Sequence, residues 1–285
     1  MSKIDEFESL FKSAAKPVFH VEPLRIKSVM LVVDQEEKLL ADYIERTKEF
    51  LKVLNSVDLT IEISVVDGTQ FDHVQQLLDL VKGGSADLVC TYRNLHGSSV
   101  DYPYSLGEYV DVLTQVSQAP VLLLPRPEDI SELALKNTDR VMVMTDHLAG
   151  DNRLVTYGAM FTQHHGELLM AHVEDEMTFE RYIQVISKIQ DIDTDVARKQ
   201  IMEQLLKEPK DFIHSCQEGM KEAGLPLLVK PLVTVGHHIN DYKKLVTENE
   251  VDLLVMNTKD EDQLAMHGLA YPVSVELRDV PLLLI

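Results

Sequence analysis

The sequence predicts an α/β protein made of two tandem Rossmann-like domains with parallel sheets, in which the first domain is reduced. Short apolar runs rich in Val, Ile and Leu alternate with longer amphipathic stretches, a pattern typical of buried parallel strands joined by crossover helices. The 285 residues exceed the about 100–200 residues of a single domain. The second half of the chain also repeats features of the first half in the same order.

The first half predicts four strands separated by amphipathic helices. The predicted strands are Ser28–Val33, Leu59–Val66, Asp87–Thr91 and Pro120–Leu124. Apolar residues recur at helical spacing over Glu36–Leu54, Phe71–Val81 and Glu108–Val116. Residues 1–26 form an N-terminal extension, in which we expect a helix over Lys3–Ala14 that packs on the sheet.

The second half predicts five strands and a helical insertion. The strands are Arg140–Met144, Glu167–His172, Leu227–Thr234, Asp252–Met256 and Pro281–Leu284. Helices near Phe179–Gln190, Asp195–Leu206 and Asp211–Ala223 fill the insertion, residues 174–224. We place the first domain at 27–126, a linker at 127–139 with a polar helix over Glu128–Lys136, and the second domain at 140–285, because prolines 125 and 127 cannot continue a strand ladder.

An internal repeat supports this division. Residues 86–90 match residues 251–255, and residues 118–124 match residues 279–285. In each half a glycine, Gly107 or Gly268, stands 13 residues before the proline of the last strand. Ordered correspondences of this kind indicate a duplication.

Composition excludes several classes of function. The formal charge of −20 repels phosphate backbones, so we expect neither nucleic acid nor anionic membrane as a partner. No apolar run approaches the roughly 20 residues of a membrane helix, and the N-terminus lacks the pattern of a secretory signal, so we expect a cytoplasmic protein. Cys90 and Cys216 are far apart, which predicts two buried small side chains and neither a disulfide framework nor a zinc site.

The second half resembles the universal stress protein family from Arg140 to Ile285. Residues 141–146 look like the family's first strand with its terminal aspartate, residues 168–173 like the second strand, and residues 251–257 like the fourth strand before the nucleotide loop. The first half resembles the family only in part and lacks a second strand with its following helix. The resemblance implies an adenine nucleotide alpha hydrolase-like fold, with pairing of the last strands, Pro120–Leu124 and Pro281–Leu284, in a pseudo-dimer or a homo-oligomer.

The nucleotide motif of that family is degenerate in this sequence. ATP-binding members carry Gly-x2-Gly-x9-Gly followed by Ser or Thr, because glycines let backbone N–H groups approach phosphates. Here Asn257 and Asp260 replace the early glycines, and Leu269 follows Gly268. The acidic run 260–262 opposes phosphates, since a like charge at 4 Å costs about 4 kcal/mol at an effective dielectric of 20.

A ligand site without a phosphate cradle remains open in the second half. The resemblance places Asp146, Val173, Asn257, Thr258 and Gly268 at it, with Asp34 and Gly107 as degenerate first-half equivalents. The acidic residues 174–176 and 260–262 favour a neutral, weakly charged or cationic ligand. The alternative for each aspartate is a cap on a strand-to-helix turn.

The corresponding loop of the first half, residues 91–97, also has two interpretations. Arg93 and His96 could hold an anion there, although Glu108 opposes it; otherwise the loop is a structural turn.

No common catalytic motif occurs, so we expect no enzymatic activity, no catalytic residue, no metal and no cofactor. The adjacent His pairs at 164–165 and 237–238 diverge too much to chelate one metal. We therefore expect a stress-response or signalling protein that binds a protein partner or a small ligand without catalysis. The alternative is a member that binds ATP or another adenine nucleotide, with slow hydrolysis or phosphotransfer.

Overall fold

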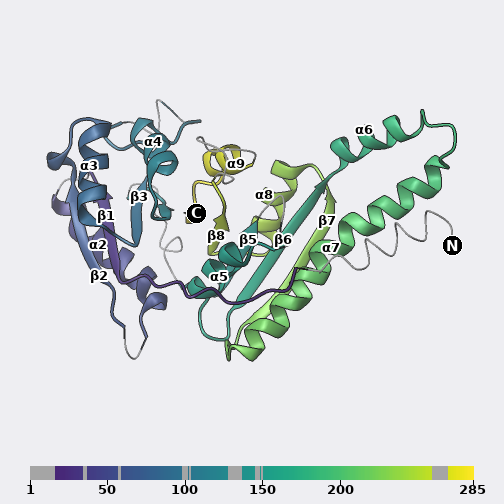
Figure 1. The fold of residues 1–285 in the computed structure, drawn as a ribbon. Coiled ribbons are helices and arrows are strands. Elements are labelled where there is room, and N and C mark those ends of the chain that lie inside the picture. The colour runs from purple at the N-terminus through teal and green to yellow at the C-terminus, as the bar shows by residue number, and fades with distance from the viewer. Residues whose placement is uncertain are drawn as a thin grey trace.

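All nine predicted strands form, and they join in one mixed sheet (Figure 1). Its strand order is β2-β1-β3-β4-β9-β8-β5-β6-β7. The structure is a computed structural model that describes residues 17–34, 37–56, 59–97, 102, 104–127, 137–144, 148, 150–258 and 269–285. Within these ranges, no helix is long and apolar enough to cross a membrane.

The first half contributes four parallel strands, and all but the outermost one are buried because helices cover both faces. The strands are β1 (Ser28–Val33), β2 (Glu62–Asp67), β3 (Leu88–Tyr92) and β4 (Val121–Leu124). The helices are α2 (Glu37–Phe50), continued by a 3-10 turn η1 (Leu51–Leu54), then η2 (Gly68–Gln70), α3 (Val74–Gly84) and α4 (Glu108–Val116). β2 stands at the end of the sheet, so the described part of this half has one strand fewer than the second half, as the sequence predicts.

The second half contributes five parallel strands. They are β5 (Arg140–Met144), β6 (Glu167–Asp175), β7 (Leu228–Gly236), β8 (Leu253–Met256) and β9 (Leu282–Leu284). The helices are α5 (Asn152–Phe161), α6 (Glu176–Ile186), α7 (Thr194–Glu222), α8 (His238–Glu248) and α9 (Ala270–Glu276). Their order, β7-β6-β5-β8-β9, is that of a doubly wound sheet, with β5 at its centre.

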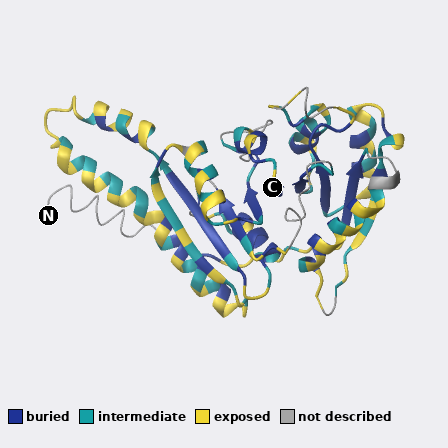
Figure 2. Cartoon of the chain, turned by 180° about the vertical axis from the view of Figure 1, so that it is seen from behind, coloured by how far each residue is buried: buried dark blue, intermediate teal, exposed yellow. Residues whose placement is uncertain are grey.

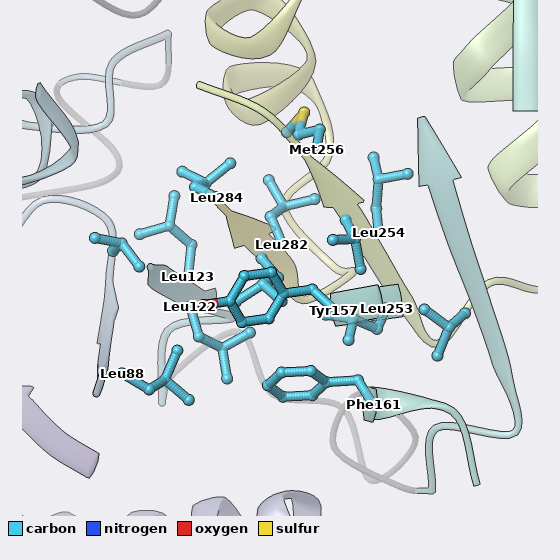
Figure 3. Packing of buried hydrophobic residues seen from close by; sticks show 14 of the residues in the cluster. Leu88, Leu122, Leu123, Tyr157, Phe161, Leu253, Leu254, Met256, Leu282 and Leu284 are labelled. Carbon is cyan, nitrogen blue, oxygen red and sulfur yellow. The ribbon is translucent and has the colours of Figure 1, made fainter. Parts of the chain in front are cut away.

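The two halves meet where their last strands pair. β4 and β9 run antiparallel, with Leu122 opposite Leu283, which confirms the predicted pairing of the last strands. Figure 3 shows Tyr157 and Phe161 of α5 lying among leucines of both halves, in one continuous apolar cluster. All other strand pairs are parallel. The carboxyl ends of the first-half strands and of the second-half strands therefore lie at opposite edges of the sheet.

One prediction in the helical insertion is wrong. The stretches predicted at Asp195–Leu206 and Asp211–Ala223 form a single 29-residue helix, α7, which contains Pro209. An interior proline costs a helix about 3 kcal/mol. Burial offsets this cost, because each fully buried large apolar side chain contributes roughly 1.5–3 kcal/mol, and α7 buries several apolar side chains around and beyond the proline: Pro209, Phe212, Ile213, Cys216 and Met220.

Residues 17–27 form an extended segment, here called the N-terminal strap, that crosses the second half before entering β1 (Figure 1). Phe19 is buried against Phe212 of α7, with ring centroids 6.4 Å apart, and its N–H donates to Ser215 Oγ at 3.1 Å. The N–H of Glu22 donates to Thr156 Oγ1 of α5 at 3.1 Å. The helix predicted at Lys3–Ala14 and the link at Glu128–Lys136 lie outside the described residues.

Candidate functional site

The candidate site lies where the strand order of the second half changes direction, between β5 and β8. Open α/β sheets bind ligands at the carboxyl ends of strands at such a point. Asn257 follows β8 directly, and its Nδ2 donates to Asp151 Oδ2 at 2.5 Å. The other oxygen of Asp151 caps α5 by accepting from Leu154 N at 2.9 Å. An amide–carboxylate pair therefore spans the switch point.

Asp151 was not among the residues predicted from the sequence. Its signal was available, because an aspartate directly before an apolar helix is a common N-cap. Nothing in the sequence, however, indicates that its second oxygen would meet Asn257, since this contact joins residues 106 positions apart.

Thr258, also predicted as a ligand contact, is hydrogen-bonded to Ile285, the residue that follows β9. It is buried, and both its N–H and its Oγ1 donate to the carbonyl of Ile285, at 2.9 Å and 2.8 Å. Ile285 N in turn donates to Met256 O at 3.0 Å. Thr258 thus fixes where the loop after β8 begins, and its own donors are engaged by backbone.

Val173 lies near the end of β6, the strand next to β5. Its N–H donates to the hydroxyl of the buried Tyr242, at 3.1 Å. Beyond it, Asp175 caps α6, and Glu174 Oε2 lies 3.4 Å from Nε2 of the buried His172. Carboxylates therefore stand at the carboxyl end of β6, on the same side of the sheet as Asn257. They belong to the strand itself, which is longer than the predicted Glu167–His172. Asp146 and Gly268, predicted for this site, lie outside the described residues.

In the first half, the equivalent point is filled by the chain itself. Asp34 N donates to the Tyr92 hydroxyl at 2.8 Å, and this hydroxyl donates back to Asp34 Oδ1. The second oxygen, Oδ2, accepts from His96 N at 2.5 Å. Tyr92 is fully buried and packs edge-on against Tyr43. Both carboxylate oxygens of Asp34 are thus engaged within the fold.

The loop that follows β3 bonds internally. Asn94 N donates to Leu106 O at 2.8 Å, and Gly97 N donates to Asn94 O at 2.9 Å. Gly107 has φ 87°, and a Cβ there would lie 2.8 Å from Asn94 Cα, so this position needs glycine for a close backbone approach. These contacts favour the structural-turn interpretation of this loop over an anion site.

Arg93 points away from any anion site in this loop. Its buried guanidinium donates to two carbonyls at the end of α9: Nη2 lies 2.6 Å from both Ser274 O and Leu277 O, and Nε lies 3.1 Å from Ser274 O. Arg126 donates to Arg93 O at 3.0 Å. The Arg93 guanidinium therefore links the loop after β3 to α9 of the second half.

Other potential reactive groups are embedded in the core. Burial raises the pKa of the Cys90 thiol, and it raises that of Cys216 to about 12. Both cysteines are free and buried, as predicted, so neither thiol ionises near neutral pH. Within the described ranges, no three His, Cys, Asp or Glu residues gather as metal ligands.

Two surface hollows lie at the amino ends of strands, on the far side of each half from its candidate site. One, of about 550 Å³, lies between the end of α7 and the start of β7 and is lined by Gln217, Lys221 and Leu228 among others. The other, of about 410 Å³, lies between α3 and α4 and is lined by Leu78 and Val116. Sequence reasoning anticipated neither, because no motif marks them.

Comparison with known proteins places the fold. No family model matches the chain, and no curated protein matches it in sequence. Among solved structures, a universal stress protein from Archaeoglobus fulgidus matches with a TM-score of 0.54 at 14% identity, over 91% of this chain and 96% of that one. A protein of unknown function from Pseudomonas aeruginosa matches with a TM-score of 0.50 at 10% identity, over 91% and 92%. The predicted resemblance is confirmed at the level of fold: over 91% of its length, the chain has the α/β fold of a universal stress protein.

Proposed function

We propose that the chain is a stress-response or signalling protein that binds a small ligand or a partner at the carboxyl ends of β5, β6 and β8, without catalysing a reaction. The observation that carries this proposal is the half-buried amide–carboxylate pair of Asn257 and Asp151, which stands at the switch point of the second half. In the first half, the carboxylate of Asp34 accepts hydrogen bonds from Tyr92 and His96.

The charges around this pair favour a neutral or cationic ligand. Asp151 lies at the switch point itself, and Glu174 and Asp175 are the last residues of the adjacent strand β6. The whole chain carries −20, which further raises the free energy of bringing a phosphate to this edge. An adenosine-like molecule fits these charges and agrees with the family resemblance, whereas a triphosphate does not.

Three groups that could act as nucleophiles are in states that agree with a binding role. The two thiols are buried with raised pKa values. Asp34, which follows β1, accepts hydrogen bonds from the Tyr92 hydroxyl and from His96 N. A binding role uses the polar pair at the second switch point and requires none of these groups to react.

The test compares adenosine and ATP in thermal melts, together with mass spectrometry of any small molecule that co-purifies. We expect millimolar adenosine to raise the melting temperature clearly and ATP to raise it by less than about 2 °C. Asn257→Ala should abolish the adenosine shift, since it removes the amide but leaves the Asp151 cap on α5. Asp34→Asn, the matched first-half variant, should retain the shift.

Two results would change the proposal. A micromolar affinity for ATP by calorimetry would favour the nucleotide-binding alternative, with slow hydrolysis or phosphotransfer. Loss of the adenosine shift in Asp34→Asn but not in Asn257→Ala would move the site to the first half.

A further inference from the structure

The helical insertion contains a projecting hairpin, here called the arm, which comprises residues 177–207. It includes most of α6, the connecting turn and the first part of α7, and it extends away from the sheet beyond β6 and β7 (Figure 1). Phe179 and Ile183 are buried where α6 packs on α7. Across this contact, Arg198 Nη2 donates to Glu180 Oε2 at 2.9 Å. The inner faces of the two helices of the hairpin therefore pack against each other.

The outer face of the arm is apolar and exposed. Tyr182 and Val185 are 57% and 58% exposed and stand three residues apart on one face of α6, and Ile189, in the turn that follows this helix, is also exposed. The stripe continues around the turn through Ile192 and Val196, which are also exposed. Figure 2 shows how much of the arm lies open to solvent. A helical hairpin that is apolar on both its inner and outer faces normally has the outer one covered.

The net charge of the arm agrees with a second copy of the chain covering this stripe. The arm holds five acidic residues and five basic residues, so its net charge is zero in a chain of −20. The acidic residues are Glu180, Asp191, Asp193, Asp195 and Glu203, and the basic residues are Arg181, Lys188, Arg198, Lys199 and Lys207. A strongly basic or acidic partner gains no attraction from a neutral surface. A second copy of the chain, by contrast, meets no like-charge repulsion there, although the rest of its surface repels it.

Topology agrees with a second copy. The last strands β4 and β9 already pair within the chain, so their edges are not available to join two copies. α7 has 29 residues and at 1.5 Å per residue is about 43 Å long, which holds the arm away from the acidic body.

We propose that two copies of this chain dimerise through their arms, with two-fold symmetry, as a four-helix bundle centred on the stripe of Tyr182, Val185 and Ile189. A two-fold interface places the same patch of each copy against the other. Antiparallel helix pairs that each present an apolar face commonly close into such a bundle.

The test is the mass of the full chain in solution, measured by sedimentation at tens of micromolar. The intact chain should sediment at twice its 32.3 kDa. Val185→Lys should weaken association at least about 30-fold, because it places a charge in the buried stripe. Val116→Lys, at a comparably exposed position on α4, should remain dimeric. An intact chain that stays monomeric at 100 µM would overturn the proposal, as would a dimer that persists in Val185→Lys.

A second measurement decides the case if Val185→Lys fails to fold. Val185→Cys should form an intermolecular disulfide under mild oxidation, because the symmetric bundle brings the two copies of this position together. Val116→Cys should not, and the native thiols do not interfere because Cys90 and Cys216 are buried. Equal cross-linking of both variants would show that the arms do not form the interface.

Discussion

At the scale of single residues, Arg93 is the side chain that joins the two halves most directly. It leaves the loop after β3 and donates to Ser274 O and Leu277 O, at the end of α9. A cation at a helix C-terminus is favourable, since the last carbonyls have no intrahelical partner. Hydrogen bonds from a charged donor contribute more than neutral ones. Truncation of the Arg93 side chain would leave these two carbonyls without their charged donor and would open a cavity.

We expect Arg93→Met to lower the free energy of unfolding by about 2–4 kcal/mol, because the two carbonyls lose their buried charged donor. Urea unfolding followed by circular dichroism measures the change. The control is Arg46→Met, which removes an exposed ion pair with Asp42 on α2 and should cost less than about 0.5 kcal/mol. Equal effects of the two variants would show that the buried contacts of Arg93 are not stabilising.

Sequence reasoning gave the positions of residues at this scale more readily than their contacts. Asn257 lies at the switch point as predicted, and Asp34 lies at the end of β1. Their partners, Asp151 and Tyr92, depend on how strands far apart in sequence are ordered in the sheet, which residue pattern alone does not give. The role of Arg93 was missed for the same reason, because its acceptors are more than 180 positions away.

At the scale of elements, the N-terminal strap and α7 show how an irregular segment can be fixed by one helix. The strap passes so close to α7 that a Cβ on Gly219 would lie 2.9 Å from Phe19 Cδ1 and 3.2 Å from Phe19 O. The helix therefore needs a glycine at the crossing, even though glycine weakens a helix by roughly 1 kcal/mol relative to alanine.

Two glycine-to-alanine substitutions test this crossing. We expect Gly83→Ala in α3 to stabilise the protein by about 0.4–1 kcal/mol, since a methyl group there meets no atom within 4 Å. Gly219→Ala should instead destabilise it by about 1–3 kcal/mol, because the methyl group displaces the strap. Urea unfolding gives both values, and faster hydrogen exchange in residues 17–27 of Gly219→Ala would locate the effect. Stabilisation by both variants would contradict the close crossing.

Most strands were predictable because parallel strands covered on both faces have continuous runs of Val, Ile and Leu. All nine predicted strands form, including the two outermost ones, whose apolar runs are interrupted. The single helix α7 was not predicted, because a proline usually interrupts a helix and the burial of Pro209 depends on tertiary packing. The strap has no periodicity to detect. Its position follows from Phe19 packing on Phe212, a contact between residues far apart in the sequence.

At the scale of the whole molecule, the two halves share one core. The apolar cluster runs without interruption from β1 to β7 through the β4–β9 pair. Tyr157 and Phe161 of α5 lie beside leucines of both halves (Figure 3). A core of this kind unfolds as one cooperative unit, because neither half can open without exposing apolar surface of the other.

We expect Leu283→Ala, a fully buried position in β9, to destabilise both halves together by about 2–5 kcal/mol. Hydrogen exchange followed by mass spectrometry should show faster global exchange in peptides from β1 and from β6 to the same extent. Leu228→Ala, at a largely exposed position in β7, is the control and should leave both unchanged. Faster exchange confined to β5–β9 would show instead that the halves unfold independently.

The strand order leaves two outermost strands, β2 and β7, and β7 is built to stop the sheet from growing. Leu228 N donates inward to Gly166 O, and amides along a strand point alternately to its two sides. The amide position of Pro231 therefore faces outward, where proline has no N–H to offer an incoming strand. Neighbouring Lys230 adds a charge, held by Glu167. Proline and lysine are the residues that natural sheets use against edge-to-edge aggregation, so this long strand can stay exposed without recruiting further chains into a fibril.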